Sequence, residues 1–160
     1  MNDLKPDRET FEQKYDLYSG FLYRLCVTYL KNHASSEDTV QEAFIKLFFK
    51  APHFETPLNE RKWLTKITIN LCRDKLRNSW LKRVVPMELP KETCSYPETN
   101  EVFMVVQALP EKYRTVILLN CVEGFTIEEI ADTLSVGVSA VKMRLKRGKE
   151  QLKMDLEEEL

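Results

Sequence analysis

Glycine and proline are scarce in this chain of 160 residues, which has four glycines and seven prolines. Both types are typical of turns between strands, so their scarcity argues against a β-rich fold. No apolar run approaches the ~20 residues that cross a bilayer, so we expect no membrane insertion. The polar, mixed-charge segment at residues 1–16 is not expected to be a secretory signal. The sequence therefore predicts an all-α, cytoplasmic protein.

Cysteine pairs of the kind that bind metals are also lacking. The four cysteines lie far apart with no C-x-x-C pair, and neither histidine is spaced with them as a ligand. We expect reduced cysteines, no metal site and no cofactor, with a redox or zinc role as the alternative. The four cysteines are Cys26, Cys72, Cys94 and Cys121, and the two histidines are His33 and His53.

The net charge of −1 conceals two basic segments. Residues 61–83 contain eight lysines or arginines against one acid, and residues 138–149 contain five against none. Two such segments predict two surfaces that contact a polyanion. The alternative is two solvated helix faces.

Apolar spacing in the first half predicts three helices. The second would open at a capping box of Ser35 and Asp38 and run to about Lys50, and the third would run to about Lys82. The residues expected on the buried faces are Phe11, Tyr15, Tyr18, Leu22, Leu25 and Tyr29 in the first helix, Val40, Phe44, Leu47 and Phe48 in the second, and Trp63 or Leu64, Ile67, Leu71 and Leu76 in the third.

Residues 83–99 contain three of the prolines among polar residues, without periodicity, and this predicts an extended linker. The expected domains are therefore residues 1–82 and residues 100–160. In the second domain, apolar residues predict one helix near residues 100–109 and another that starts at Pro110 and stops before Gly124.

Residues 126–147 have the pattern of a helix-turn-helix. Thr126 and Glu129 predict a capping box, residues 134–137 a tight turn, and residues 138–147 a second helix. On this helix Val141 and Leu145 would face inward, and the outward set would be Ser139, Lys142, Arg144 and Lys146. Such a helix enters the major groove, and a basic face without acids suits DNA contacts. An ordinary helical hairpin with a charged face is the alternative.

Three segments resemble a known family. The stretch LPEKYRTVILLNCVEGFTIEEIADTLSVGVSAVKMRLKRGKEQL (residues 109–152) resembles region 4 of bacterial sigma factors of the extracytoplasmic-function (ECF) group. EDTVQEAFIKLFFK (residues 37–50) resembles region 2.2, and WLTKITINLCRDKLR (residues 63–77) resembles regions 2.3 and 2.4. The chain departs from the family pattern at Ser139-Ala140 and Met143, which concerns the −35 sequence that it would read.

The resemblance implies an alternative sigma factor, which is not an enzyme. Such a protein binds core RNA polymerase, recognises promoter DNA, helps to melt the −10 element and initiates transcription. For members of the ECF group, the genes transcribed are stress-response genes. The implied partners are core RNA polymerase, promoter DNA and an anti-sigma factor, which is membrane-bound for many relatives.

The resemblance also assigns residues to these contacts. Core polymerase would be bound by Asp38, Gln41 and Glu42. The −10 DNA would be bound by Asn70, Arg73, Lys75 and Arg77. The −35 DNA would be bound by Thr126, Ser139, Lys142, Arg144 and Arg147. The loop at residues 52–59 would lie beside a flipped base.

The same residues allow three other functions: a regulator, a structural adaptor and a carboxylate site. A helix-turn-helix regulator with a signal-receiving N-terminal half would show a glycine-rich loop or an acidic phosphoacceptor pocket, and residues 1–82 have neither signature. A structural adaptor would not need two basic segments. Asp38 and Glu42, at i and i+4, could form a metal or acid–base pair, but no third ligand is spaced with them.

Overall fold

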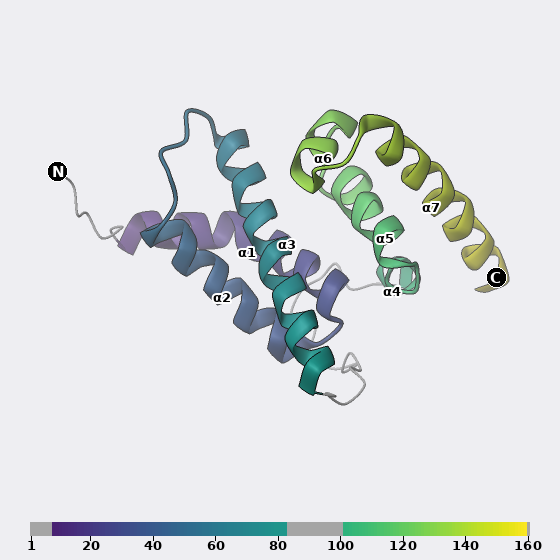
Figure 1. Cartoon of the computed structure of the whole chain (residues 1–160), viewed down its shortest axis with the longest axis horizontal. Helices are drawn as coiled ribbons and strands as arrows, with labels where there is room; N and C mark the ends of the chain where they lie inside the picture. The colour runs from purple at the N-terminus through teal and green to yellow at the C-terminus, as the bar shows by residue number, and fades with distance from the viewer. Residues whose placement is uncertain (1–7, 83–100, 160) are drawn as a thin grey trace. The chain divides into compact units, whose positions relative to one another are not determined.

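Every regular element that the computed structural model describes, over residues 8–82 and 101–159, is a helix. The helices before residue 83 form one compact unit, and those after residue 100 form another (Figure 1). The all-α class expected from the sequence is confirmed. The linker predicted at residues 83–99 lies outside the described residues.

The first unit consists of α1 (Arg8–Leu30), α2 (His33–Phe49) and α3 (Pro57–Lys82), and each helix packs against the other two. Their shared core is apolar because each helix turns one face toward its neighbours. Among the buried residues are Tyr18, Leu22, Leu25, Cys26 and Tyr29 from α1, Val40, Ala43, Phe44 and Leu47 from α2, and Leu64, Ile69 and Cys72 from α3.

The first two aromatic residues of the expected α1 face are not buried. Phe11 and Tyr15 are 41% and 40% exposed, although their rings contact α2. The ring centroids of Phe11 and Phe48 lie 4.9 Å apart, and those of Tyr15 and Phe44 lie 5.1 Å apart. This end of the unit is therefore an aromatic cluster at the surface, which covers the edge of the core.

The cap of α2 differs from the predicted one. Asn32, with an extended backbone, is the N-cap, and its Oδ1 accepts a hydrogen bond from the Ser35 amide at 2.8 Å. The prediction of a Ser35–Asp38 capping box was wrong because asparagine caps helices as well as serine does, and the helix starts earlier. Asp38 is consequently free of a capping role and lies within α2.

The buried face of α3 also differs from the predicted one. Ile67 and Leu71 are only half-buried, whereas Thr65 and Thr68 are fully buried. The Thr65 hydroxyl donates to the Arg61 carbonyl and the Thr68 hydroxyl to the Leu64 carbonyl, each at 2.7 Å. A threonine whose hydroxyl is bonded within its own helix can enter an apolar core, and this rotates α3 away from the expected face.

Two polar contacts join the start of α3 to α1. Glu60 accepts a hydrogen bond from the Tyr18 hydroxyl at 2.8 Å and pairs with the Lys14 ammonium at 2.6 Å. Burial of Tyr18, together with the hydrogen bond to Glu60 and its charge, raises the pKa of the phenol above its ordinary value. The loop that precedes α3 therefore ends at a fixed point on the unit.

The second unit contains α4 (Glu101–Gln107), α5 (Glu111–Ile117), α6 (Ile127–Leu134) and α7 (Val138–Glu159). A π-helical segment, η1 (Leu118–Val122), continues α5, and Gly124, with a φ of 76°, lies in the turn that follows. The core residues of this unit include Val106, Leu109, Val116, Ile117, Leu118, Leu119, Phe125, Ile130, Val141 and Leu145. The long α7 packs along α5 and α6.

A glycine allows α7 to approach α5 closely. Gly148 is buried, and a Cβ atom there would lie 3.1 Å from Ile117 Cγ1 and 3.3 Å from Tyr113 Cβ. These distances are shorter than ordinary van der Waals contacts, so any larger residue would push the two helices apart. The position of α7 in the unit therefore depends on Gly148.

We expect Gly148→Ala to destabilise the second unit. Alanine favours a helix over glycine by about 1 kcal/mol, but overpacking a core costs about 1–3 kcal/mol, so the melting temperature should fall by several degrees. Thermal unfolding followed by circular dichroism measures the shift. The matched control is Gly20→Ala in α1, where the added Cβ would meet only the end of the Arg24 side chain. A Gly148→Ala protein that melts at or above the wild-type temperature would contradict this packing.

Candidate functional site

The outward face of α2 carries the residues expected to contact polymerase. Asp38, Gln41 and Glu42 lie away from the buried side of α2, and the side chains of Asp38 and Glu42 are 64% and 42% exposed. Carboxylates and an amide on one exposed helix face can pair with the cationic and polar side chains of a partner helix. This set of three residues is brought together as the sequence predicts.

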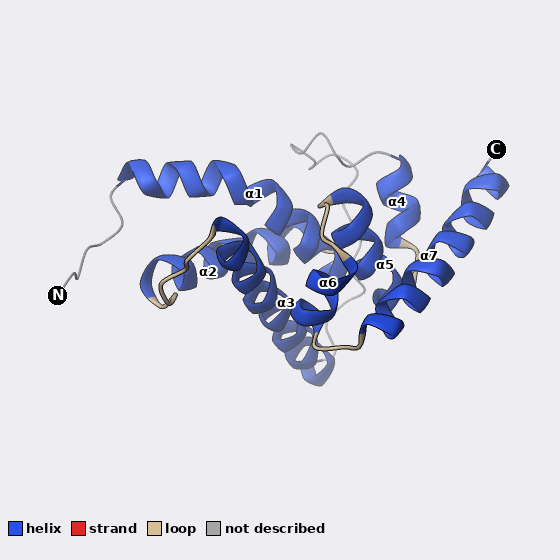
Figure 2. Ribbon diagram, turned by 90° about the horizontal axis from the view of Figure 1, so that it is seen from above, coloured by secondary structure: helices blue, strands red, loops and turns tan. Residues whose placement is uncertain are grey.

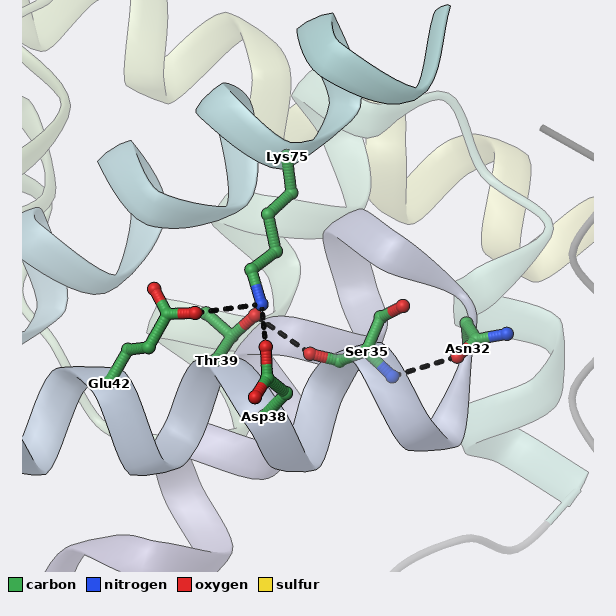
Figure 3. A network of polar contacts seen from close by, with 6 residues as sticks. All are labelled: Asn32, Ser35, Asp38, Thr39, Glu42 and Lys75. Atoms are coloured by element: carbon green, nitrogen blue, oxygen red, sulfur yellow. Dashed lines mark hydrogen bonds and ion pairs between the residues drawn. The ribbon is translucent and has the colours of Figure 1, made fainter. Parts of the chain in front are cut away.

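Lys75 reaches this face from α3. Its ammonium lies 2.5 Å from Asp38 Oδ2 and 3.2 Å from Glu42 Oε1, and Figure 3 shows the side chain extending from α3 to α2 between the two carboxylates. The Lys75 side chain is 25% exposed, so the pair is partly shielded from water. Lys75 therefore links the helix expected to contact polymerase with the helix expected to contact the −10 element.

The ion pairs alter the pKa of both partners. A hydrogen bond from Lys75 and its positive charge lower the pKa of the Asp38 carboxyl. Burial acts to lower the pKa of Lys75, but its hydrogen bonds and the charges of Asp38 and Glu42 outweigh this and raise the pKa overall. Both groups are therefore held in their charged forms at neutral pH.

The other −10 candidates lie on the exposed side of α3. Asn70 and Arg73 are exposed, and Arg77 is exposed while pairing with Asp74 one turn earlier. The Arg73 guanidinium lies 5.9 Å from the centre of the Tyr29 ring, close enough for a cation–π contact. The Lys75 ammonium is already shared between two carboxylates, whose negative charges oppose a phosphate at this position.

The loop expected beside a flipped base is anchored at two places. The Phe54 and Trp63 rings pack with centroids 5.6 Å apart, which leaves Trp63 half-buried at the start of the α3 core. At the end of the loop the Thr56 hydroxyl accepts a hydrogen bond from the Asn59 amide at 3.1 Å, and Pro57 starts α3. His53, immediately before the first anchor, is exposed.

Two apolar residues of α2 were missed by the sequence reasoning. Ile45 and Phe49 are 55% and 65% exposed, and the 3.6-residue period puts them on the same outward side as Asp38 and Glu42. The signal was available, because α2 has more apolar residues than one buried face can hold. We call Asp38, Gln41, Glu42, Ile45 and Phe49 the α2 surface.

The helix-turn-helix is built as the sequence predicts. The Thr126 hydroxyl accepts from the Glu129 amide at 3.1 Å, and Glu129 Oε2 accepts from the Thr126 amide at 3.3 Å, which forms the expected capping box. Ser135, with a φ of 56°, ends α6, and the Val136 amide donates to the Ala131 carbonyl. Figure 2 shows the short loop that follows and leads into α7.

The −35 candidates differ in how they are presented. Ser139, Lys142 and Arg147 are exposed on α7, whereas Arg144 is half-buried beside the inward Leu145. The expectation that Arg144 lies on the outward face is thus not confirmed. The amide of Thr126 is occupied by Glu129, so a phosphate would have to displace that carboxylate.

The histidines, cysteines and acids of the described residues do not gather at one place. No group of three or more His, Cys, Asp and Glu residues is placed there to hold a metal ion. Cys26 and Cys72 are buried and Cys121 is exposed, all as free thiols, while Cys94 lies outside the described residues. Burial and a hydrogen bond with Cys72 raise the pKa of the Cys26 thiol, which opposes thiolate chemistry. Among the described helices, none is long and apolar enough to cross a membrane.

We expect Lys75→Gln to raise the pKa of Asp38 toward the ordinary value of about 3.9. Because the pair lowers this pKa in the folded protein, it stabilises the fold above the unfolded-state pKa, and this contribution is lost as the pH falls through the folded-state value. Carboxyl titration by NMR measures the shift, with Lys66→Gln, an exposed lysine of α3, as the control. Identical Asp38 titration in wild type and Lys75→Gln would mean that the ion pair does not form in solution.

Comparison with known proteins gives two family matches, one in each unit. Residues 15–82 match the model described as "Sigma-70 region 2", and residues 99–152 match that described as "Sigma-70, region 4". The two matches cover most of the chain.

Individual relatives agree with these matches. The chain is 30% identical to the ECF RNA polymerase sigma factor SigW of Bacillus subtilis, over 95% of this chain and 91% of that protein. It is 31% identical to the ECF RNA polymerase sigma factor SigE of Mycolicibacterium smegmatis, over 82% of this chain and 56% of that protein.

A solved structure supports the fold. The sigma factor RpoE from Bartonella quintana, crystallised with the anti-sigma factor NepR, matches with a TM-score of 0.79 at 22% identity, over 93% of this chain and 98% of that chain. The first unit matches region 2, the second matches region 4, and SigW matches over nearly the whole chain. The chain therefore belongs to the sigma-70 family, in its ECF group.

Proposed function

We propose that this protein acts as an alternative sigma factor that binds core RNA polymerase and directs it to promoters. There it would help to melt the −10 element and to initiate transcription of stress-response genes. It would act in the cytoplasm, with no catalytic step or cofactor of its own. The observation that carries the proposal is that two separate units match sigma regions 2 and 4 in the order that the family requires. A regulator with a signal-receiving N-terminal half is not favoured, because region 2 occupies that half.

The α2 surface is the proposed contact for core polymerase. Its carboxylates can form charge-assisted hydrogen bonds with arginines of a partner helix, and Gln41 can add a neutral donor and acceptor. More than half of the surface of Ile45 and of Phe49 is exposed in the free protein. A partner that covers these side chains would remove their apolar surface from water, which favours binding. Along α2 the polar residues Asp38, Gln41 and Glu42 are followed by the apolar Ile45 and Phe49, and protein interfaces use both kinds of contact.

The exposed side of α3 is the proposed contact for the −10 element. Asn70 can present both a donor and an acceptor to a base edge, and the cationic side chains of Arg73 and Arg77 can hold phosphates. Lys75 is included with these residues, and a phosphate would compete there with the carboxylates of Asp38 and Glu42. Extruding a base costs a few kcal/mol, and the loop at residues 52–59 would contribute compensating contacts.

The N-terminal half of α7 is the proposed contact for the −35 element. Ser139 and Lys142 would meet base edges in the major groove, and Arg147 would meet the backbone. From its half-buried position Arg144 would extend past Leu145 toward the edge of the groove. Thr126 at the start of α6 would lie near a phosphate.

An anti-sigma factor is the third proposed partner. The structural neighbour RpoE was solved with one, NepR. Such a protein, including a membrane-bound one, could block transcription by covering exposed apolar residues that core polymerase also needs. The α2 surface offers residues of that kind in Ile45 and Phe49.

We expect the double variant Gln41→Ala with Phe49→Ser to weaken the complex with core RNA polymerase by about 1–3 kcal/mol, because it removes one polar and one apolar side chain from the proposed interface. The melting temperature should hold, since both side chains are exposed. A fluorescence titration with core polymerase at several salt concentrations measures the affinity. Leu17→Ser, an equally exposed apolar residue on α1, is the matched control. Unchanged affinity of the double variant would remove the α2 surface from the interface.

A further inference from the structure

The residue at the centre of the outward face of α7 is a methionine. Helix α7 buries Val141, Leu145 and Gly148, and Met143 lies about 200° around the helix from Val141. Its side chain is 52% exposed. Single exposed apolar residues are common on protein surfaces, so what gives Met143 significance is its position.

The neighbours of Met143 on this face are polar or cationic. Ser139 lies one turn before it and Arg147 one turn after it, Lys142 and Lys146 lie beside it on one side of the helix, and all four are exposed. Residues 138–149 contain no acid. Met143 is therefore the apolar centre of a surface whose charge is complementary to a polyanion.

The major groove offers one apolar group on the edges of its base pairs, the C5-methyl group of thymine. Lysine, arginine and serine can read the hydrogen-bonding atoms of base edges, but a methionine has no donor for them. Its unbranched, flexible thioether can adjust to an apolar group whose exact position varies.

We infer that Met143 contacts the methyl group of a thymine in the −35 element and thereby determines the preference for a T·A pair at one position. This inference rests on the proposed function of α7 and adds a specificity-determining residue to it. Lys142 and Arg147 would hold the helix in the groove, and Met143 would favour thymine over bases that lack the methyl group.

Uracil tests the inference directly, because it pairs as thymine does and lacks only the C5-methyl group. The probe is a −35 duplex selected from a random pool by the wild-type protein reconstituted with core polymerase, with each thymine replaced in turn by uracil. We expect one replacement to weaken wild-type binding by about three- to fivefold, the value of one buried methyl group. In Met143→Ala the thymine duplex should bind more weakly by a similar factor, and the same replacement should have no further effect.

Met154→Ala is the matched control, since Met154 is a 57% exposed methionine further along α7. It should leave the affinity and the uracil profile unchanged. An unchanged uracil profile in Met143→Ala would overturn the inference. It would also be overturned if Met143→Ala bound core polymerase more weakly in the absence of DNA, because the loss would then not arise at thymine. If the wild-type holoenzyme shows no preference among −35 sequences at all, the proposed function of α7 fails, and the inference fails with it.

Discussion

In each unit a helix buries one face against its neighbours, so the opposite face carries whatever the protein presents to its partners. This constraint is visible in α2, where Val40 and Phe44 enter the core while Ile45 and Phe49 stay in solvent. It applies equally to α7, where Val141 and Leu145 are buried and Met143 is exposed. Apolar residues on an outward face add little to the core, so Ile45, Phe49 and Met143 are available to a partner.

The first unit joins two of its proposed contacts in one rigid element pair. Lys75 of α3 pairs with Asp38 and Glu42 of α2, so the helix proposed for the −10 element and the helix proposed for polymerase share a charge cluster (Figure 3). The two proposed contacts are therefore neighbours within the first unit, joined by one lysine.

Local signals in the sequence predicted the fold class, the Thr126 capping box and the inward residues of the helix-turn-helix, because these depend on residues within a few positions of each other. The burial of Thr65 and Thr68 was not predictable from hydropathy, since their hydroxyls are satisfied inside α3. The Lys75 pairs depend on how α3 crosses α2, and a charge count assigns such a lysine to the basic surface. The half-burial of Arg144 likewise follows from packing around Leu145 that a helical period alone does not resolve.

The role proposed for this chain is to give core RNA polymerase the ability to start at particular promoters. The most direct measurement is transcription in vitro from a library of random upstream sequences, with core polymerase and this protein as the only components. We expect transcripts that begin downstream of shared −35 and −10 sequences and that are absent without the protein. Transcripts that are unchanged by its addition, or that share no upstream sequence, would contradict the proposed role.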